Sequence, residues 1–295
     1  MEEANKLKDY LQKRHTEATV YGYFRSIMIY IEEQPEAKKS NYKEIVNYIG
    51  VLRSRYNKPS TIKYMLNAIK KYYEYLLYTG QRKDHPCRDL NIKNKLHKDV
   101  QLQDLLTEKE LETIIAYQSK RYKNVLEIRD RAMLSLLIYQ GITKGEIKRL
   151  TISDLNLEAG SLYIKSSVTS NSRTLELNNK QILILYKYKN EIRPKLLKNN
   201  PLRTVTDSLF ISIKGKAETG GSLIYIFSRI RQQQGKAITT RLIRQSVIAI
   251  KLKNGNDIRL VQEFAGHKNP STTERYKSTD IEELKAGINK YHPLR

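Results

Sequence analysis

The spacing of apolar side chains over the first 80 residues is that of α-helices. Aromatic and aliphatic residues recur every three or four positions between Tyr21 and Ile31, and again between Ile45 and Leu52. A third stripe starts after Pro59, runs from Ile62 to Leu76, and stops before Gly80. Residues 1–90 are therefore predicted to form an all-α domain.

A second domain is predicted to begin after a short linker. Residues 91–105 are polar and carry several lysines with little periodicity, which is typical of a linker. Thr107 stands three positions before Glu110, a spacing that predicts a capped helix N-terminus. We therefore expect the second domain to span residues 106–295.

This second domain is expected to be mostly α with a small antiparallel β-hairpin. An apolar helix is predicted over 131–139, and a short helix follows over 146–150. Alternating residues at 161–164 and 174–177 predict two strands that flank a polar turn, and helices resume near Lys180. The fold class is mainly α, with no internal repeat.

Length and charge add to this picture. A chain of 295 residues is longer than one hydrophobic core usually serves, which agrees with two domains. Lys and Arg number 54 against 31 Asp and Glu, a net charge of +23 spread along the chain. Lysine-rich helices can simply be solvated, but a charge of this size favours a polyanionic partner, and nucleic acid is the expected one.

The single cysteine, Cys87, excludes a disulfide framework and a Cys-x-x-Cys metal cluster. It is expected to be a small buried apolar residue in a protein of a reducing compartment. The N-terminal residues lack the order of a signal peptide, and no apolar run has membrane-spanning length. We expect a soluble, cytoplasmic protein that needs no metal or other cofactor.

The candidate chemistry lies near the C-terminus. His267 precedes Tyr276 by nine positions, and Arg241 and Arg244 lie upstream on a helix-like segment. Breaking a phosphodiester by transesterification needs a nucleophile, cationic donors for the non-bridging oxygens and an acid for the leaving alkoxide. Arginine matches a phosphate because its planar fork donates two hydrogen bonds and keeps its charge. One tyrosine among 21 is more often a packing residue, so the order and spacing carry the prediction.

This segment resembles the tyrosine recombinase, or phage-integrase, family, which includes the Xer recombinases. The family pattern is His-x-x-Arg, then Leu-Gly-His, then Thr-Thr-x-x-Tyr. Here Ala265-Gly266-His267 and Thr272-Thr273-Glu274-Arg275-Tyr276 match the last two parts, and Arg241-Leu242-Ile243-Arg244 occupies the first. The resemblance covers nearly the whole chain. It implies a SAM-like core-binding domain over 1–90 and a catalytic domain of the DNA breaking-rejoining fold over 106–295.

The resemblance also implies roles for individual residues. Tyr276 would attack the scissile phosphate to form a 3′-phosphotyrosyl link, Arg244 would hold a non-bridging oxygen, and His267 would donate a hydrogen bond or assist proton transfer. The family's lysine in the hairpin turn would act as general acid. Lys165 is our candidate for it, and a solvated lysine at a strand end is the alternative. Lys63, Lys70, Lys71 and Arg173 are predicted DNA contacts.

Two positions depart from the family pattern. The family places an arginine two residues after the glycine of the first catalytic loop, where this chain has Thr143. Some integrases of mobile elements lack that arginine, and Lys144 or Arg149 are local replacements to consider. The second departure is Arg241 in the histidine position, where it can supply a phosphate contact but no base.

A last helix is expected beyond Tyr276, capped by Thr279-Asp280 and carrying an apolar stripe that packs either on its own domain or on a neighbouring protomer. The sequence thus predicts a site-specific recombinase or integrase of a mobile element that assembles on double-stranded DNA, as a tetramer, in association with the nucleoid. One alternative is a catalytically impaired, recombinase-like DNA-binding protein. Another is an RNA-binding or helix-turn-helix regulator.

Overall fold

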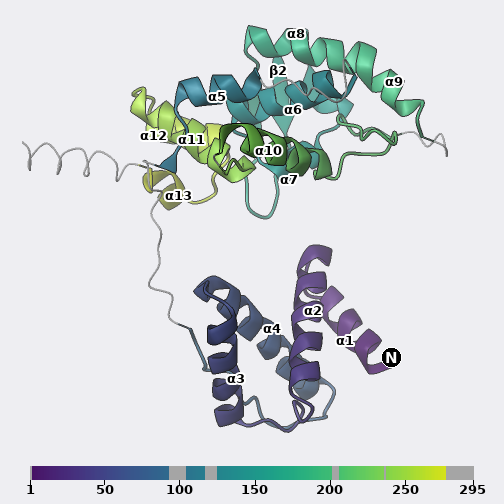
Figure 1. The fold of residues 1–295 in the computed structure, drawn as a ribbon, viewed down its shortest axis with the longest axis vertical. Coiled ribbons are helices and arrows are strands. Elements are labelled where there is room, and N and C mark those ends of the chain that lie inside the picture. The colour runs from purple at the N-terminus through teal and green to yellow at the C-terminus, as the bar shows by residue number, and fades with distance from the viewer. Residues whose placement is uncertain (1, 93–103, 117–124, 201–205, 236, 277–295) are drawn as a thin grey trace, which may run out of the picture. The chain divides into compact units, whose positions relative to one another are not determined.

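The structure, a computed structural model, describes residues 2–92, 104–116, 125–200, 206–235 and 237–276. The chain divides into two compact units, Met1–His97 and Lys98–Arg295 (Figure 1), and each has its own hydrophobic core. None of the helices among the described residues combines the length and apolarity needed to cross a membrane.

In its described residues the first unit is entirely helical, as the apolar pattern predicted. Local signals set the helix ends: Asn41 and Glu44 form a reciprocal capping box, and Pro59 occupies the first turn of its helix. The helices are α1 (Glu2–Gln12), α2 (Glu17–Glu33), α3 (Tyr42–Arg55) and α4 (Pro59–Tyr78).

Tyrosines fill much of the core of the first unit. The hydroxyls of Tyr30 and Tyr73 lie 2.7 Å apart, and Tyr73 also donates to the Ala37 carbonyl oxygen at 2.8 Å. Because the hydroxyls of Tyr30 and Tyr73 both have a partner, these two rings add apolar area without an unpaired polar atom. Cys87 is buried in the same core, as expected, and burial raises the pKa of its thiol to about 12.

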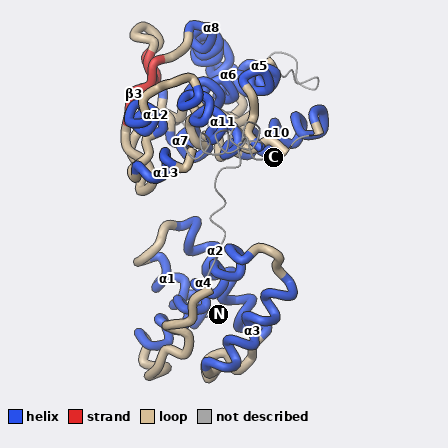
Figure 2. The backbone as a smooth tube through the Cα atoms, turned by 90° about the vertical axis from the view of Figure 1, so that its left-hand side faces the viewer, coloured by secondary structure: helices blue, strands red, loops and turns tan. Residues whose placement is uncertain are grey.

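The second unit is mostly helical with a small antiparallel sheet (Figure 2), which confirms the predicted fold class. Its described elements are α5 (Glu108–Ile115), α6 (Val125–Gln140), α7 (Lys144–Arg149), β1 (Leu155–Asn156), β2 (Ser161–Ile164), β3 (Arg173–Glu176), α8 (Asn179–Lys187), α9 (Arg193–Leu197), α10 (Gly221–Gln234), α11 (Thr240–Lys253), α12 (Ile258–Ala265) and α13 (Pro270–Glu274). A 3-10 turn at Ile152–Asp154 precedes β1, and a π-helical turn at Tyr188–Ile192 joins α8 to α9.

Helix α6 forms the centre of this unit. It is longer than the predicted 131–139 and is buried on nearly every side, polar residues included. A helix surrounded by protein shows no single apolar face, which is why periodicity marked only its most apolar part. The capping box at Thr107 and Glu110 is present as predicted, with Thr107 Oγ1 accepting from the Glu110 amide at 3.2 Å.

The sheet has the order β1-β2-β3, so the predicted hairpin is β2 and β3, with Leu162 opposite Leu175 and Ile164 opposite Arg173. The two-residue strand β1 is too short for a sequence pattern to predict. Helix α12 packs along β3 (Figure 2). This contact brings the hairpin to the C-terminal segment that carries His267.

Candidate active site

Arg241 and Arg244 lie one turn apart at the start of α11, whose N-terminus is capped by Thr239. Arg241 is exposed, whereas the Arg244 side chain keeps only 13% of its surface exposed. Arg244 Nη1 donates to the Gly141 carbonyl oxygen at 2.6 Å, and Nη2 donates to that of Ala265. The guanidinium is therefore held by the turn before α7 and by the end of α12.

His267 follows the glycine that ends α12. Gly266 has φ +68°, a left-handed conformation that reverses the chain and brings the imidazole back towards α13. Its Nδ1 lies 2.9 Å from Thr273 Oγ1. Burial, together with the charges of Arg244 and Arg173, lowers the pKa of His267 to about 4. The imidazole is therefore neutral at pH 7.

Tyr276 lies just after α13 and is 8% exposed. Its ring packs in a small cluster with Ile248, Val261 and Ala265. Burial raises the pKa of the phenol, and the charges of Arg244 and Arg241 oppose part of this rise. The phenol thus stays protonated at neutral pH, beside two guanidinium groups.

The structure brings Arg244, His267 and Tyr276 together, although they come from three different elements. Arg244 is bonded to the residue two positions before His267, and its charge acts on both His267 and Tyr276. The result is a fixed cation, a neutral imidazole and a phenol in one place. These groups can bind a phosphodiester, donate a hydrogen bond to it and supply a nucleophile.

Thr143, the position of the family's first arginine, is the N-cap of α7. Its Oγ1 accepts from the Glu146 amide at 3.1 Å, and its own amide donates to Glu146 Oε2 at 2.7 Å. This position therefore holds a helix cap instead of a cation. Lys144 packs against the turn at Gly220, and Arg149 is exposed on the last turn of α7.

Lys165 lies at the end of β2 and has half of its side chain exposed. Its Nζ lies 3.2 Å from Asp154 Oδ1 and 3.3 Å from Thr151 Oγ1. It also lines a small cavity together with Glu146 and Arg149. Its role as general acid stays a prediction.

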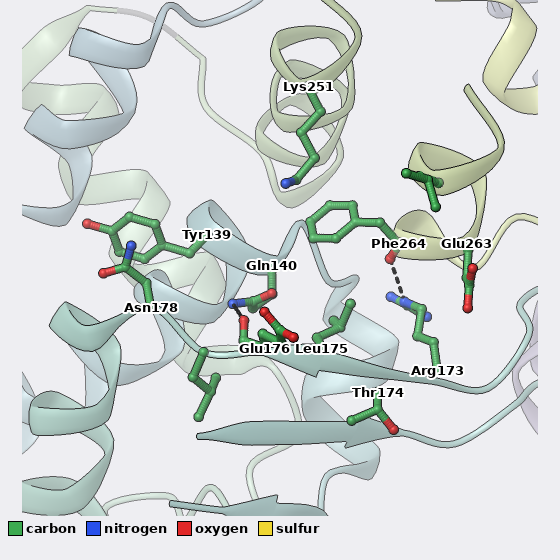
Figure 3. Close-up of a pocket in the computed structure, with 12 residues that line it drawn as sticks. Tyr139, Gln140, Arg173, Thr174, Leu175, Glu176, Asn178, Lys251, Glu263 and Phe264 are labelled. Carbon is green, nitrogen blue, oxygen red and sulfur yellow. Dashed lines mark hydrogen bonds between the residues drawn. The ribbon is translucent and has the colours of Figure 1, made fainter. Parts of the chain in front are cut away.

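The structure gives Arg173 a different environment from the one predicted for a DNA contact. Its side chain is 2% exposed, its Nη1 pairs with Glu146 at 2.7 Å, and its Nε donates to the Phe264 carbonyl oxygen at 2.7 Å. Figure 3 shows the side chain reaching from β3 to Phe264, beside a groove of about 610 Å³. Direct contact with a DNA surface is thus corrected to a buried ion pair, because β3 starts at Arg173 and turns it inward.

The three predicted DNA contacts of the first unit lie on α4. Lys63 is exposed, whereas Lys70 donates to the Arg88 carbonyl oxygen at 2.8 Å and Lys71 pairs with Glu74 at 2.7 Å. Their binding of DNA stays a prediction. The helix expected from Thr279 onward lies outside the described residues.

Glu146 and Thr273 were not among the predicted site residues. Glu146 is 2% exposed and links Thr143, Arg173 and Arg244, and Thr273 is fully buried beneath His267. Thr143-Lys144-Gly145-Glu146 does fit a capping-box spacing, which was the available signal for Glu146. In the described part of the chain, no group of three or more His, Cys, Asp or Glu side chains could hold a metal ion.

Comparison with known proteins shows the family to which the chain belongs. The model of the phage integrase family matches residues 104–283, more than half of the chain. The chain therefore belongs to the phage integrase family and is an enzyme of the tyrosine recombinase class. This confirms the predicted family, whereas an RNA-binding or helix-turn-helix regulator finds no support.

Two relatives match along almost their whole length. The chain is 27% identical over 291 residues to tyrosine recombinase XerD of Oceanobacillus iheyensis, covering 96% of this chain and 95% of the relative. It is also 27% identical over 293 residues to XerD of Listeria monocytogenes, covering 98% and 93%.

Solved structures agree on the fold. The XerH site-specific recombinase bound to palindromic difH substrate aligns with a TM-score of 0.70 at 20% identity, covering 91% of this chain and 78% of that chain. A lambda integrase dimer bound to a core site aligns with a TM-score of 0.68 at 16% identity, covering 93% and 75%.

Proposed function

We propose that this chain cuts and rejoins double-stranded DNA at a specific site through a covalent link between Tyr276 and the 3′-phosphate of the cut strand. The observation that carries the proposal is the convergence of Arg244, His267 and Tyr276 around one point of the second unit. Family membership supports it, because the matched region contains all three residues.

The chemistry follows from the state of each group. Arg244 binds a non-bridging oxygen through the donors that its two carbonyl bonds leave over. Tyr276 attacks the phosphorus, so that a bond to the phenolic oxygen forms as the bond to the 5′-oxygen breaks. The phenol loses its proton in this step, and we assign its relay to His267, the neutral imidazole of the site, which is fixed through Nδ1.

Two further cations complete the proposed site. Lys165 donates a proton to the leaving 5′-oxygen, which requires it to exchange its contacts with Asp154 and Thr151 for the DNA. Arg241 is exposed one turn before Arg244 and acts on Tyr276 through its charge, which suits a second contact to the phosphate. Religation reverses the steps, since the phosphotyrosyl ester keeps the energy of the broken bond.

The proposed partners are double-stranded DNA and further copies of this chain, assembled as a tetramer on the DNA. Two domains would both contact the duplex: a core-binding domain over 1–90 and a catalytic domain over 106–295, joined by a linker over 91–105. Lys63, Lys70 and Lys71 would face the DNA backbone. The net charge of +23 supports this partner. A mobile-element integrase that acts in the cytoplasm, at the nucleoid, fits these features.

A catalytically impaired DNA-binding protein is the alternative, because Thr143 replaces a cation. One experiment distinguishes an active recombinase from an impaired DNA-binding protein. The full chain is incubated with a nicked suicide duplex, which is built from the sequence that the protein protects in the DNA beside its gene. A covalent adduct that forms in EDTA and disappears in Tyr276→Phe supports recombinase chemistry. Tight duplex binding by the wild type without any adduct supports the impaired protein.

A further inference from the structure

The buried ion pair between Arg173 and Glu146 lies directly behind the candidate active site. Both side chains are almost fully enclosed, 2% and 1% exposed, and their charged atoms lie 2.7 Å apart. Arg173 also holds the Phe264 carbonyl oxygen, three residues before His267 (Figure 3). The pair therefore connects β3, α7 and the end of α12.

Glu146 lies between two arginines. Its Oε1 accepts from Arg173, and its Oε2 lies 4.0 Å from Arg244 Nη1. Burial by itself would raise the pKa of Glu146, but the bond with Arg173 and the charge of Arg244 bring it below its ordinary value. The carboxylate is therefore ionised next to the arginine that we place on the phosphate.

The balance of the charges on Arg173, Glu146 and Arg244 determines how much positive charge Arg244 can present to a phosphate. With Arg173 present, one carboxylate stands against two guanidinium groups, and a net positive charge remains. Without Arg173, the buried carboxylate would have Arg244 as its remaining close cation, and charges interact strongly where water is excluded. Glu146 would then neutralise Arg244 and draw it away from the phosphate.

The contact between Arg173 and the His267 turn is unusually close. A Cβ at Gly266 would meet Arg173 Nη1 at 2.5 Å, so the glycine is what lets the guanidinium lie against this turn. The amide of Asn171, two residues before Arg173, donates to the Gly266 carbonyl oxygen at 2.9 Å. Arg173 Nη2 is also buried, without a hydrogen-bond partner among the described residues.

We infer that Arg173 is a positioning residue of the strand-cleaving site: it neutralises Glu146, so that the charge of Arg244 remains available to the scissile phosphate. It thereby supplies from inside the fold part of the cationic character that the family draws from the position of Thr143. This inference rests on the proposed function, since it concerns the same site.

The test is a double-mutant cycle on Arg173 and Glu146 in the full chain, with the suicide duplex described above as substrate. Arg173→Gln should slow adduct formation roughly 100-fold, comparable to the loss of one oxyanion donor, with little change in duplex affinity. Adding Glu146→Gln removes the unpaired carboxylate, so the double variant should cleave at least about tenfold faster than Arg173→Gln. Because removing both partners of a buried ion pair can restore stability as well, each rate is expressed per folded molecule, so that rescue reports the chemistry and not the fold.

Controls separate folding from chemistry. Arg193→Gln removes another buried arginine of this unit, one bonded to the Thr206 and Ser208 carbonyl oxygens, and should lower the unfolding midpoint without slowing cleavage. Arg173→Lys keeps the charge and should cleave faster than Arg173→Gln. If Arg173→Gln does not fold, the comparison of Arg173→Lys with the double variant decides, since both should form the adduct.

Two results overturn the inference: an Arg173→Gln variant that cleaves at the wild-type rate, or a double variant no faster than Arg173→Gln. If Arg173→Gln does not fold, the inference is overturned when neither Arg173→Lys nor the folded double variant forms the adduct. In each case the wild type still forms an adduct through Tyr276, so the proposed function stands. Absence of any adduct from the wild type contradicts the proposed function instead.

Discussion

Arg244 Nη1 donates to the Gly141 carbonyl oxygen over 2.6 Å, which ties the start of α11 to the turn that ends α6. The second nitrogen of the same guanidinium bonds to the Ala265 carbonyl oxygen, next to the turn that carries His267. Two backbone segments thus fix the orientation of the Arg244 guanidinium, which remains charged. Orientation of this kind is what a phosphate-binding donor needs before substrate arrives.

Arg244→Lys should therefore lose most of the cleavage activity. An ammonium carries its donors on one nitrogen and lacks the planar fork, so it cannot reach the two carbonyl oxygens that Arg244 holds through separate nitrogens and also bind a phosphate oxygen. We expect single-turnover adduct formation to fall roughly 100-fold or more, with duplex affinity changed only a few-fold. A Lys variant that retains the wild-type rate would mean that Arg244 is not in contact with the phosphate.

The depressed pKa of His267 predicts a specific pH dependence of stability. In the unfolded chain the imidazole takes up a proton near pH 6.5, whereas in the folded protein it does so only near pH 4. Keeping the His267 imidazole neutral therefore costs the folded protein nothing above pH 6.5. As the pH falls from 6.5 towards 4, the free energy of unfolding decreases, because the unfolded chain takes up a proton that the folded protein does not. Between pH 7 and pH 5 the free energy of unfolding should drop by about 2 kcal/mol more in the wild type than in His267→Gln. Urea unfolding at both pH values measures this, and parallel losses would show that His267 titrates normally.

The fold was predictable where one segment carries its own signal. The capping box at Thr107 and Glu110 and the apolar stripe of α4 are local, and both appear in the structure as expected. Arg173 was assigned wrongly because its partners, Glu146 and Phe264, are 27 and 91 positions away, and only the packing of α7, α12 and β3 brings them together. Arg244, His267 and Tyr276 are predicted through a motif, whereas their protonation states depend on burial that no sequence pattern shows.

The exposed Arg241 is expected to compensate for the missing arginine at position 143. Arg241→Ala should slow cleavage roughly 100-fold, and Arg241→His should remain below the wild type, because it restores the family's residue without the charge. Thr143→Arg combined with Arg241→His should recover activity, measured as the rate of adduct formation in a double-mutant cycle.

The structure adds a control to this cycle. Thr143 caps α7, so its replacement by a residue that cannot cap costs about 1 kcal/mol of stability, and Thr143→Ala measures that effect alone. Strictly additive rates, or an Arg241→Ala variant with the wild-type rate, would place Arg241 on the surface without a catalytic role.

Lys165 can be tested by changing the leaving group. If its ammonium protonates the leaving 5′-oxygen, Lys165→Ala should cleave an ordinary duplex roughly 100-fold more slowly. A duplex with sulfur at that bridging position needs no acid, because a thiolate leaves readily, and the variant should cleave it at the wild-type rate. If Lys165→Ala is equally slow on both substrates, the general acid is another group. Asp154→Asn is the matched control, because it frees Lys165 from its ion pair and keeps the ammonium.

The most direct test of the account is the identity of the residue that becomes joined to DNA. The adduct with the suicide duplex would be digested with protease and nuclease, and the modified peptide sequenced by mass spectrometry. We predict a nucleotide attached through its 3′-phosphate to Tyr276, together with a released strand whose free 5′-hydroxyl can be labelled by a kinase. A nucleotide on any other residue, or a 5′-phosphate on the released strand, would contradict the assignment of Tyr276 as the nucleophile.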